Sequence, residues 1–512
     1  MSDRAIARYV GSSTKVIDLA GRLAIPGFVE AHGHFLSLGR ARMILPLDQA
    51  DTWQEMVDMV AFAAGDIATD VWIQGRGWHQ EKWSEVPVGT VEGVPTHHEL
   101  SRVSPNNPVV LGHASGHGAF ANARAMELAG IDRNTPNPPG GEIVHDSTGE
   151  PTGYLREKAQ TLVSLAQARW DSTRPEEVRH AETVRRVALA GEDLLPKGIT
   201  SFQDAGSSFE RLDVFRELAE QGELPVRLYV MVRDSNHYLA EKLADYRTIE
   251  GYGGFLTVRA VKRTIDGALG SHGAWMLEPY EDLATTGLST VDLDYYSATA
   301  EIAFANGFQL ASHAIGDRAN REVLDIYQAI YETNGNPQDL RWRIEHAQHM
   351  HPDDVFRFAP MGIIASMQAI HATSDGPWVF KRLGAERAES GAYLWRSLLN
   401  EGVVIANGTD VPVEDADPIA NFYASVTRIQ NDGSAFFADQ RMTREEALRS
   451  QTLDAAYAAF EEGSKGSLTA GKYADVVVLS GNIMTVPVDE ILAARVDYTI
   501  LGGKVVYERD ED

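Results

Sequence analysis

Short apolar runs that end in a polar residue recur along the chain, and helical sequence lies between them from the second run onward. Strands that alternate with helices predict parallel βα units. Eight such units close into a barrel that presents the carboxyl ends of its strands on one face. The predicted fold class is therefore α/β, a (β/α)8 TIM barrel. The eight predicted strands cover residues 23–34, 198–204, 225–231, 257–266, 308–313, 341–346, 362–368 and 402–410, and helical stretches include 298–306, 317–334 and 443–460.

The segment between the first and second predicted strands is much longer than an ordinary loop, because it spans residues 36–195. A connection of that length must carry its own secondary structure. Its pattern predicts helices over 52–64 and 176–195, a strand over 108–113 and a hairpin over 140–154. We interpret it as an insertion that caps the active site, because βα loops build the substrate pockets of barrels.

The two ends of the chain differ from the barrel. Short β segments are predicted over 16–23, 474–479 and 498–507, with a turn at Gly502 and Gly503. They indicate a small β-sandwich domain formed by residues 1–22 and 466–512. Residues 23–465 are then left for the barrel and its insertion.

Composition and charge narrow the function classes. The chain has 512 residues and a formal net charge of −27, which disfavours nucleic acid and anionic membranes as partners because both are polyanions. Solubility explains an acidic surface equally well, so the charge selects no substrate. The absence of cysteine excludes disulfides, thiolate zinc sites and cysteine nucleophiles. Residues 1–15 lack the apolar core of a signal peptide, and no later run reaches the roughly 18 apolar residues of a membrane span, which predicts a cytoplasmic protein.

Histidines and an aspartate mark the ends of several predicted strands. His32 and His34 lie two positions apart, so both imidazoles point the same way from a strand and can reach one ion. His313, His346 and Asp410 end the fifth, sixth and eighth strands. Each alone is more often a satisfied polar group, but together they mark the face where barrel enzymes place catalysis. Neutral imidazoles and a carboxylate suit one or two divalent ions, Zn first, while Fe, Mn and Ni accept the same ligands.

Lys262 lies in the fourth predicted strand, and Thr264 and Asp266 share its face by the period of two. A lysine that points into a barrel must be paired or modified, because a buried ammonium is costly. One interpretation is a Lys262–Asp266 ion pair, and the other is a carboxylated lysine that bridges two metals. The residues alone leave both open.

Several motifs in order resemble one known family. The run PGFVEAHGHF resembles the first-strand signature of the amidohydrolase superfamily. The runs SHAIGDRAN, RIEHAQ and GTDVPVE resemble the fifth-, sixth- and eighth-strand signatures of its amidohydrolase family 3 branch, which includes N-substituted formamide deformylase. Further similarity lies in GITSFQDAG, VKRTIDGALGS and GSLTAGKYADVVVL, and in GRGWHQEKW, SGHGAFANARAM and PTGYLRE of the insertion. The resemblance covers nearly the whole chain.

This resemblance implies specific roles. The terminal β-sandwich of the family matches the β segments at both ends, although strands that usually precede the equivalent of Val16 are missing or shortened. Lys262 falls where the bridging, carboxylated lysine of the superfamily would sit. The implied metal ligands are His32, His34, His313, His346 and Asp410.

The resemblance and the chemistry together give a mechanism. A metal-activated hydroxide attacks a carbonyl, Asp410 takes a proton from the water and passes it to the leaving amine, and His346 or a neighbour helps to hold the oxyanion. The substrate contacts are less constrained, because each residue also has a purely structural interpretation. Glu157 is a pocket acid or a charge at a helix N-terminus, and Arg318 holds a substrate carboxylate or pairs with Asp317. His117 and Trp83 are the other candidate substrate contacts, and aromatic residues are more often core than substrate wall.

We therefore predict a metal-dependent amidohydrolase that acts on a C–N bond, an amide, N-acyl or N-formyl group, of a small organic molecule. The same site chemistry serves ester, lactone or cyclic imide hydrolysis and deamination. A non-catalytic metal-binding or regulatory barrel is the alternative from another class. A homodimer is the default oligomeric state.

Overall fold

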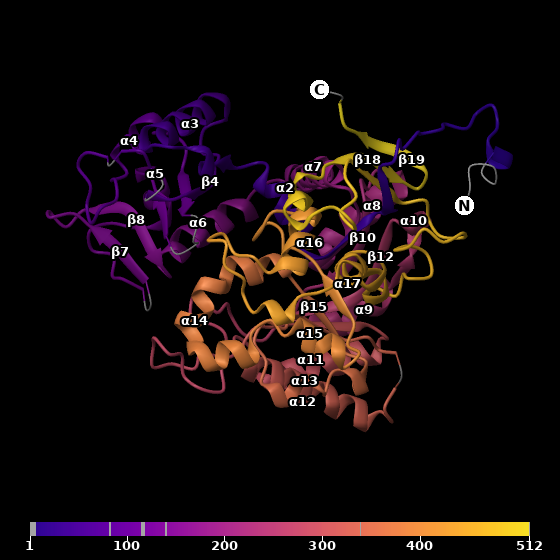
Figure 1. Ribbon diagram of the computed structural model, residues 1–512. Coiled ribbons are helices and arrows are strands. Elements are labelled where there is room, and N and C mark those ends of the chain that lie inside the picture. Colours follow the sequence, from indigo (N-terminus) through magenta and orange to yellow (C-terminus); the bar gives the residue numbers. More distant parts are fainter. Residues whose placement is uncertain are drawn as a thin grey trace. The chain divides into compact units, whose positions relative to one another are not determined.

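A computed structural model describes residues 7–80, 83–85, 87–113, 118–138, 141–337 and 339–510. The chain divides into two compact units, one made of residues 1–35 and 190–512 and the other of residues 36–189. Figure 1 follows the chain by colour, from the indigo N-terminal residues through the purple inserted unit to the yellow C-terminus. The first unit contains the barrel and a terminal sheet, and the second contains a sheet of its own.

The first unit is built on a nearly closed ring of eight parallel strands, which confirms the predicted barrel. Each barrel strand pairs in parallel with the next barrel strand along the chain, from the first to the eighth. Most of their residues are buried, because a parallel strand is covered on both faces. The strands are β2 (Phe28–Gly33), β9 (Ile199–Ser207), β10 (Arg227–Val232), β12 (Leu256–Thr264), β13 (Gln309–Ala314), β14 (Arg343–His346), β15 (Ile364–Met367) and β16 (Ile405–Asn407).

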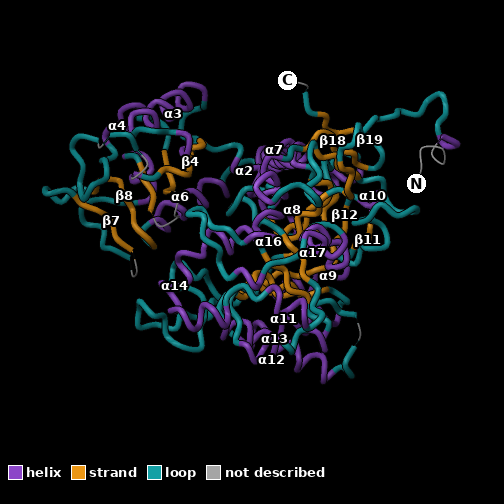
Figure 2. The backbone as a smooth tube through the Cα atoms, in the orientation of Figure 1, coloured by secondary structure: helices purple, strands orange, loops and turns teal. Residues whose placement is uncertain are grey.

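Helices of the same unit surround these strands, as the purple and orange tubes of Figure 2 show. Among the described residues, no helix is both long and apolar enough to cross a membrane. The helices are α8 (Phe209–Gln221), α9 (Asn236–Tyr246), α10 (Gly251–Gly254), α11 (Leu293–Ala305), α12 (Asp317–Thr333), α13 (Pro352–Val355), α14 (Ala369–Gly391), α15 (Trp395–Asn400), α16 (Pro418–Thr427), α17 (Arg444–Ser450) and α18 (Leu453–Ala458), and a short strand β11 (Thr248–Glu250) pairs with β12.

The ends of β2 and β16 meet just beyond the ring. The N–H of Asp410 donates to the carbonyl of His32 at 2.7 Å, and the N–H of His34 donates to the carbonyl of Val411 at 2.7 Å. These two bonds place the first and last strands side by side at their carboxyl ends. The predicted metal ligands of both strands therefore arrive at one place.

The segment 23–34, predicted as one strand, is two. β1 (Leu23–Pro26) pairs antiparallel with β17 (Val476–Leu479), whereas β2 belongs to the barrel. The break falls at Gly27, where an added Cβ would lie 2.1 Å from the hydroxyl of Thr200. Only glycine permits this close approach, so the chain changes sheets there.

Both ends of the chain contribute to one four-stranded antiparallel sheet in the order β1-β17-β18-β19, although its N-terminal strand β1 lies just beyond the predicted residues 1–22. Its other strands are β18 (Val496–Leu501) and β19 (Lys504–Glu508). The strand expected over 16–23 is wrong for residues 16–22, because the first strand begins at Leu23. Arg227 of β10 holds this sheet to the barrel through a buried pair with Asp475, at 2.7 and 3.0 Å.

The inserted unit has a six-stranded mixed sheet in the order β3-β4-β5-β6-β8-β7. Its predicted helices, strand and hairpin are present, the hairpin being β7 and β8. Its core is rich in aromatic residues, including Trp53, Trp78 and Phe120. The elements are β3 (Leu45–Pro46), β4 (Ile73–Trp78), β5 (Val109–His113), β6 (Gly118–Ala121), β7 (Gly141–His145), β8 (Pro151–Glu157), α2 (Phe35–Ala41), α3 (Trp53–Asp66), α4 (His98–Val103), α5 (Ala123–Ala129), α6 (Gln160–Ser172) and α7 (Glu176–Leu194).

Candidate metal centre

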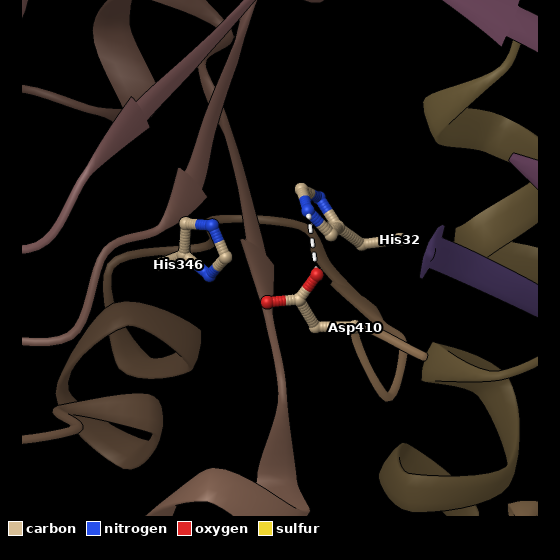
Figure 3. Close-up of side chains that lie close together, drawn as sticks. All are labelled: His32, His346 and Asp410. Carbon is tan, nitrogen blue, oxygen red and sulfur yellow. Dashed lines mark ion pairs between the residues drawn. The ribbon is translucent and has the colours of Figure 1, made fainter. Parts of the chain in front are cut away.

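Three buried side chains converge at the carboxyl end of the barrel. His32 lies in β2, His346 ends β14, and Asp410 follows β16. One ligand atom of each lies within 4.8 Å of the others, and Figure 3 shows the three side chains facing one another. The Nε2 atom of His32 is 3.6 Å from Oδ1 of Asp410.

The two other predicted ligands lie beside this group. The ring of His313, near the end of β13, has its centroid 4.4 Å from that of His346. Its Nε2 atom is buried and has no hydrogen-bond partner among the described residues. The Nε2 atom of His34 is 3.1 Å from Oδ1 of Asp410. The structure therefore brings together imidazoles and a carboxylate from four separate strands.

Two of these residues have unusual backbone conformations. His346 has φ +75° and Asp410 has φ +60°, both in the left-handed region that residues with a Cβ seldom adopt. Such a conformation carries a cost and persists where the surrounding structure imposes it, commonly at functional sites. The left-handed conformation changes the direction of the backbone at the end of the strand, and with it the direction of the side chain.

Hydrogen bonds fix how the imidazoles face the centre. Nδ1 of His32 contacts Oε2 of Glu345, and Nδ1 of His346 is 2.8 Å from Oε1 of Gln368. An acceptor at Nδ1 selects the tautomer in which Nε2 carries the lone pair that can bind a metal. The Nε2 atoms of both rings are thus the ones available for a metal.

Glu345 is itself held by a buried arginine. Arg343 is two residues earlier in β14 and forms an ion pair at 2.6 Å with Oε1 of Glu345. The arginine also donates to the carbonyl of Ala31 at 2.8 Å and to the hydroxyl of Ser366 at 2.7 Å. Burial alone would raise the pKa of Glu345, but the nearby guanidinium outweighs this and holds the pKa well below its usual range. Glu345 is therefore ionised beneath His32.

Glu30 connects the two strands that carry ligands at the closure of the barrel. Its Oε1 accepts from the N–H of Thr409 at 2.7 Å and from the N–H of His32 at 3.1 Å, while Oε2 accepts from the Thr409 hydroxyl at 2.8 Å. The carboxyl lies against Gly408, where an added Cβ would come within 2.3 Å of Oε1. Glu30 thereby fixes the backbone on either side of His32 and Asp410.

Lys262 points into the same interior. Its Nζ atom is 3.4 Å from Nε2 of His32, and burial lowers its pKa to about 8 against the opposing charges of Glu345 and Asp410. Among the described residues, Lys262 and Asp266 form no ion pair, so the first of the two interpretations of Lys262, a Lys262–Asp266 pair, is wrong. Asp266 instead accepts from the backbone N–H groups of Trp275, Ile315 and Gly316 at 2.8–3.0 Å.

The protonation states suit metal binding. Burial, followed by the charge of Lys262, lowers the pKa of His32 to about 4 and that of His313 to about 3, and burial lowers that of His346 well below the ordinary value. Burial by itself would raise the pKa of Asp410, but the adjacent histidines, His34 first, hold it well below its usual range. Neutral imidazoles beside an ionised carboxylate are the donor set that Zn²⁺ and similar divalent ions prefer. Nε2 of His313, which is buried without a hydrogen bond and 3.6 Å from Oδ1 of Asp266, fits the same conclusion.

The predicted substrate contacts lie in both units. In the barrel unit, the guanidinium of Arg318 at the start of α12 stacks 4.5 Å from the ring of Trp275 and lies 3.5 Å from Glu322. In the inserted unit, Trp83 stacks on Trp78, with centroids 5.7 Å apart. Glu157 ends β8 and is exposed, and His117 lies outside the described residues.

Sequence reasoning missed the residues that support the ligands. Arg343 and Glu345 alternate with apolar residues in RWRIEH, so the period of two already placed two charges on one face of the strand that ends at His346. Glu30 gave a similar signal in PGFVEAHGH. His371 of α14 gave no such signal, because its approach to the centre depends on the path of the chain after β15.

Comparisons with known proteins agree with this geometry. A family model described as amidohydrolase family matches residues 15–507. The protein LONG AFTER FAR-RED 3 of Arabidopsis thaliana is 34% identical, over 98% of this chain and 85% of the relative. N-substituted formamide deformylase of Arthrobacter pascens is 28% identical, over 97% of this chain and 90% of the relative. The crystal structure of an uncharacterized metal-dependent hydrolase from Pyrococcus horikoshii superposes with a TM-score of 0.75 at 26% identity, over 95% of this chain and 91% of that one.

Proposed function

The chain belongs to the amidohydrolase family, and on that premise we propose that it is a metal-dependent hydrolase that cleaves a C–N bond of a small organic substrate. The scissile group in this proposal is an amide, N-acyl or N-formyl group, a choice supported by the similarity to N-substituted formamide deformylase. The observation that carries the proposal is the convergence of neutral imidazoles and one ionised carboxylate at the carboxyl end of the barrel.

In this proposal His32, His34, His313, His346 and Asp410 hold one or two divalent ions, with zinc as the first candidate. Lys262, close to His32, is the residue that would bridge two ions after carboxylation. A lowered lysine pKa favours this modification, because the neutral amine is the form that reacts with carbon dioxide. When bound, a divalent ion polarises the scissile carbonyl and lowers the pKa of water towards ~7.

The protein's own groups then move and position the proton. Asp410 accepts it from the attacking water, which a bound ion would make more acidic, and delivers it to the leaving nitrogen, because an amine is a stronger base than a carboxylate. His34, 3.1 Å from Asp410, orients that carboxylate. His346 would help to stabilise negative charge on the carbonyl oxygen through the ion that its Nε2 would hold, because its Nδ1–H is already bonded to Gln368. Arg318, Trp83, Glu157 and His117 remain the proposed contacts of the substrate.

Replacement of Asp410 by Asn tests the proton transfer. We expect Asp410→Asn to fold and to retain most of its metal, while kcat on N-alkyl and N-aryl formamides falls by about 100-fold or more. Asp353→Asn, an exposed aspartate at the start of α13, is the matched control and should leave kcat unchanged. Retained turnover in Asp410→Asn would refute the assigned role.

Metal analysis of the purified protein tests the enzyme against the non-catalytic alternative. Mass spectrometry should find close to one or two equivalents of zinc or iron, and a chelator should abolish turnover until metal is restored. A protein that binds no metal after supplementation would instead be a binding or regulatory barrel. Turnover of esters or cyclic imides but not of formamides and acylamides would move the proposal to the other hydrolytic reactions.

A further inference from the structure

His371 is a buried imidazole beside the metal centre that the proposed mechanism does not use. It lies near the start of α14 and is 6% exposed. Its ring is parallel to that of His346, with an interplanar angle of 6° and centroids 6.4 Å apart. A group bound next to His346 is therefore within reach of His371 as well.

The protonation of this ring follows from one contact. The side-chain amide nitrogen of Gln348 is 3.3 Å from Nδ1 of His371, and the backbone carbonyl of Gln348 accepts from the N–H of Tyr393 at 2.6 Å, which anchors the backbone at this position. An amide N–H can only donate, so Nδ1 is the acceptor and Nε2 carries the ring proton. Nε2 is buried and has no hydrogen-bond partner among the described residues.

The His371 side chain does not cap the N-terminus of α14. The first N–H groups of the helix are satisfied elsewhere, because that of Ala369 donates to Asn407 and that of Ile370 donates to Asn421, each at 3.0 Å. The side chain of His371 makes no contribution to this cap. A buried donor without a partner is costly, and a bound group that accepts from it removes that cost.

We propose that Nε2–H of His371 donates a hydrogen bond to the carbonyl oxygen of the substrate and stabilises the negative charge that develops there. The proton stays on the imidazole throughout, and no bond to His371 is made or broken. This inference rests on the proposed hydrolytic function and adds a catalytic residue on α14 to the ligands from the strands. Donors aimed at a developing oxyanion accelerate acyl transfer because they act more strongly on the transition state than on the substrate.

Three variants of the full-length, metal-loaded protein test the donor. His371→Leu removes it and is expected to lower kcat by about 100-fold while changing KM by less than about threefold. His371→Gln places an amide N–H close to the former Nε2 and should recover about a tenth or more of the lost rate. His349→Phe is the matched control, because the ring nitrogens of His349 are also buried without a hydrogen-bond partner among the described residues, whereas its ring lies against Tyr393 and not against His346. The control should keep kcat within about twofold.

Gln348→Glu tests the tautomer separately. A carboxylate at this position accepts from Nδ1–H, which leaves Nε2 as the acceptor, so kcat should fall although His371 is still present. Bound metal, measured by mass spectrometry, should be the same in the wild type and all four variants. Loss of metal in His371→Leu would show a structural role and overturn the inference.

Two substrate classes separate this inference from the proposed function. The assays use a panel of N-alkyl formamides and, separately, p-nitrophenyl acetate, whose cleavage also develops an oxyanion. Turnover of either class by the wild type with an unchanged kcat in His371→Leu overturns the role of His371 alone. Ester turnover without amide turnover overturns the proposed C–N specificity and still measures His371. Turnover of neither class by the metal-loaded wild type overturns both.

Discussion

The interior of the barrel near its carboxyl end and the core of the inserted unit are both fully buried, yet they are filled with opposite kinds of side chain. Arg343, Glu345 and Lys262 put formal charges inside the barrel. The main core cluster of the inserted unit is apolar, with Leu111 packed among large aromatic side chains. A buried charge is costly even when it is paired, and apolar packing of the same volume is often at least as stable. The contacts of these charges lead to His32, so we interpret them as groups that position this proposed metal ligand.

Removal of one charge from the barrel should have the largest effect on stability. Arg343→Met leaves Glu345 buried without its counter-charge, so we expect a loss of about 3–5 kcal/mol in the free energy of unfolding. Glu345 would also be held less firmly against His32, so the amount of bound metal should fall. Urea unfolding and metal analysis measure the two effects. Arg133→Met, which breaks an exposed pair with Glu150, is the control and should cost about 1 kcal/mol or less.

The double variant Arg343→Met/Glu345→Leu separates stability from function. Removal of both charges eliminates the uncompensated carboxylate, so a substantial part of the stability should return. Metal affinity should not return, because Nδ1 of His32 has lost the acceptor that fixes its tautomer. Recovery of both stability and metal affinity would show that the buried pair has no functional role. The charges inside the barrel would then need no explanation beyond stability.

A cavity in the inserted unit should reduce stability and leave the amount of bound metal unchanged. Leu111 of β5 is fully buried, and Leu111→Ala should cost about 2–5 kcal/mol through lost packing. Bound metal should be unchanged, because all of the proposed ligands lie in the other unit. Tryptophan fluorescence during urea unfolding, combined with metal analysis, measures both. Leu128→Ala in α5 is the control, because Leu128 is exposed and should cost less than about 0.5 kcal/mol.

The same contrast explains how much of the fold could be predicted. The alternation of apolar strands with helices located all eight barrel strands, because burial on both faces leaves a strong local signal. The break at Gly27 could not be found in this way, because it depends on the side chain of Thr200, distant in the sequence. Residues 16–22 are exposed or half-buried and form no strand, although their local pattern favoured one.

The site shows a similar division. The five predicted ligands lie at strand ends, where the polar residue follows directly from the pattern of the strand, and they come together in space. Glu345 and Glu30 lie inside strands, and each has a partner that is distant in the sequence, His32 for Glu345 and Thr409 for Glu30. His371 reaches the centre from a helix. Its position depends on the tertiary path of the chain, which no local pattern encodes.

The smallest expected effect concerns a half-buried carboxylate–arginine pair near the surface, the counterpart of the fully buried Arg343 and Glu345. Glu446 caps α17 by accepting from the N–H of Thr443 at 2.7 Å and pairs with Arg396 at 2.6 and 2.8 Å. The hydrogen bond from Arg396, the largest cause, lowers the pKa of Glu446 to about 2. Glu446→Gln should therefore reduce stability by about 1 kcal/mol at neutral pH, the scale of a helix cap or a surface pair.

The pH dependence of that difference tests its electrostatic origin. Because the folded-state pKa is depressed, the contribution is fully present above the unfolded value of ~4.3 and is lost as the pH falls towards 2. Urea unfolding of Glu446→Gln and the wild type should thus give a constant difference from pH 7 to pH 5 and a smaller one at pH 3.5. Glu445→Gln, an exposed neighbour in the same helical turn, should show little difference at any of these pH values. A difference for Glu446→Gln that stayed constant down to pH 3.5 would assign its effect to lost cap geometry and not to charge.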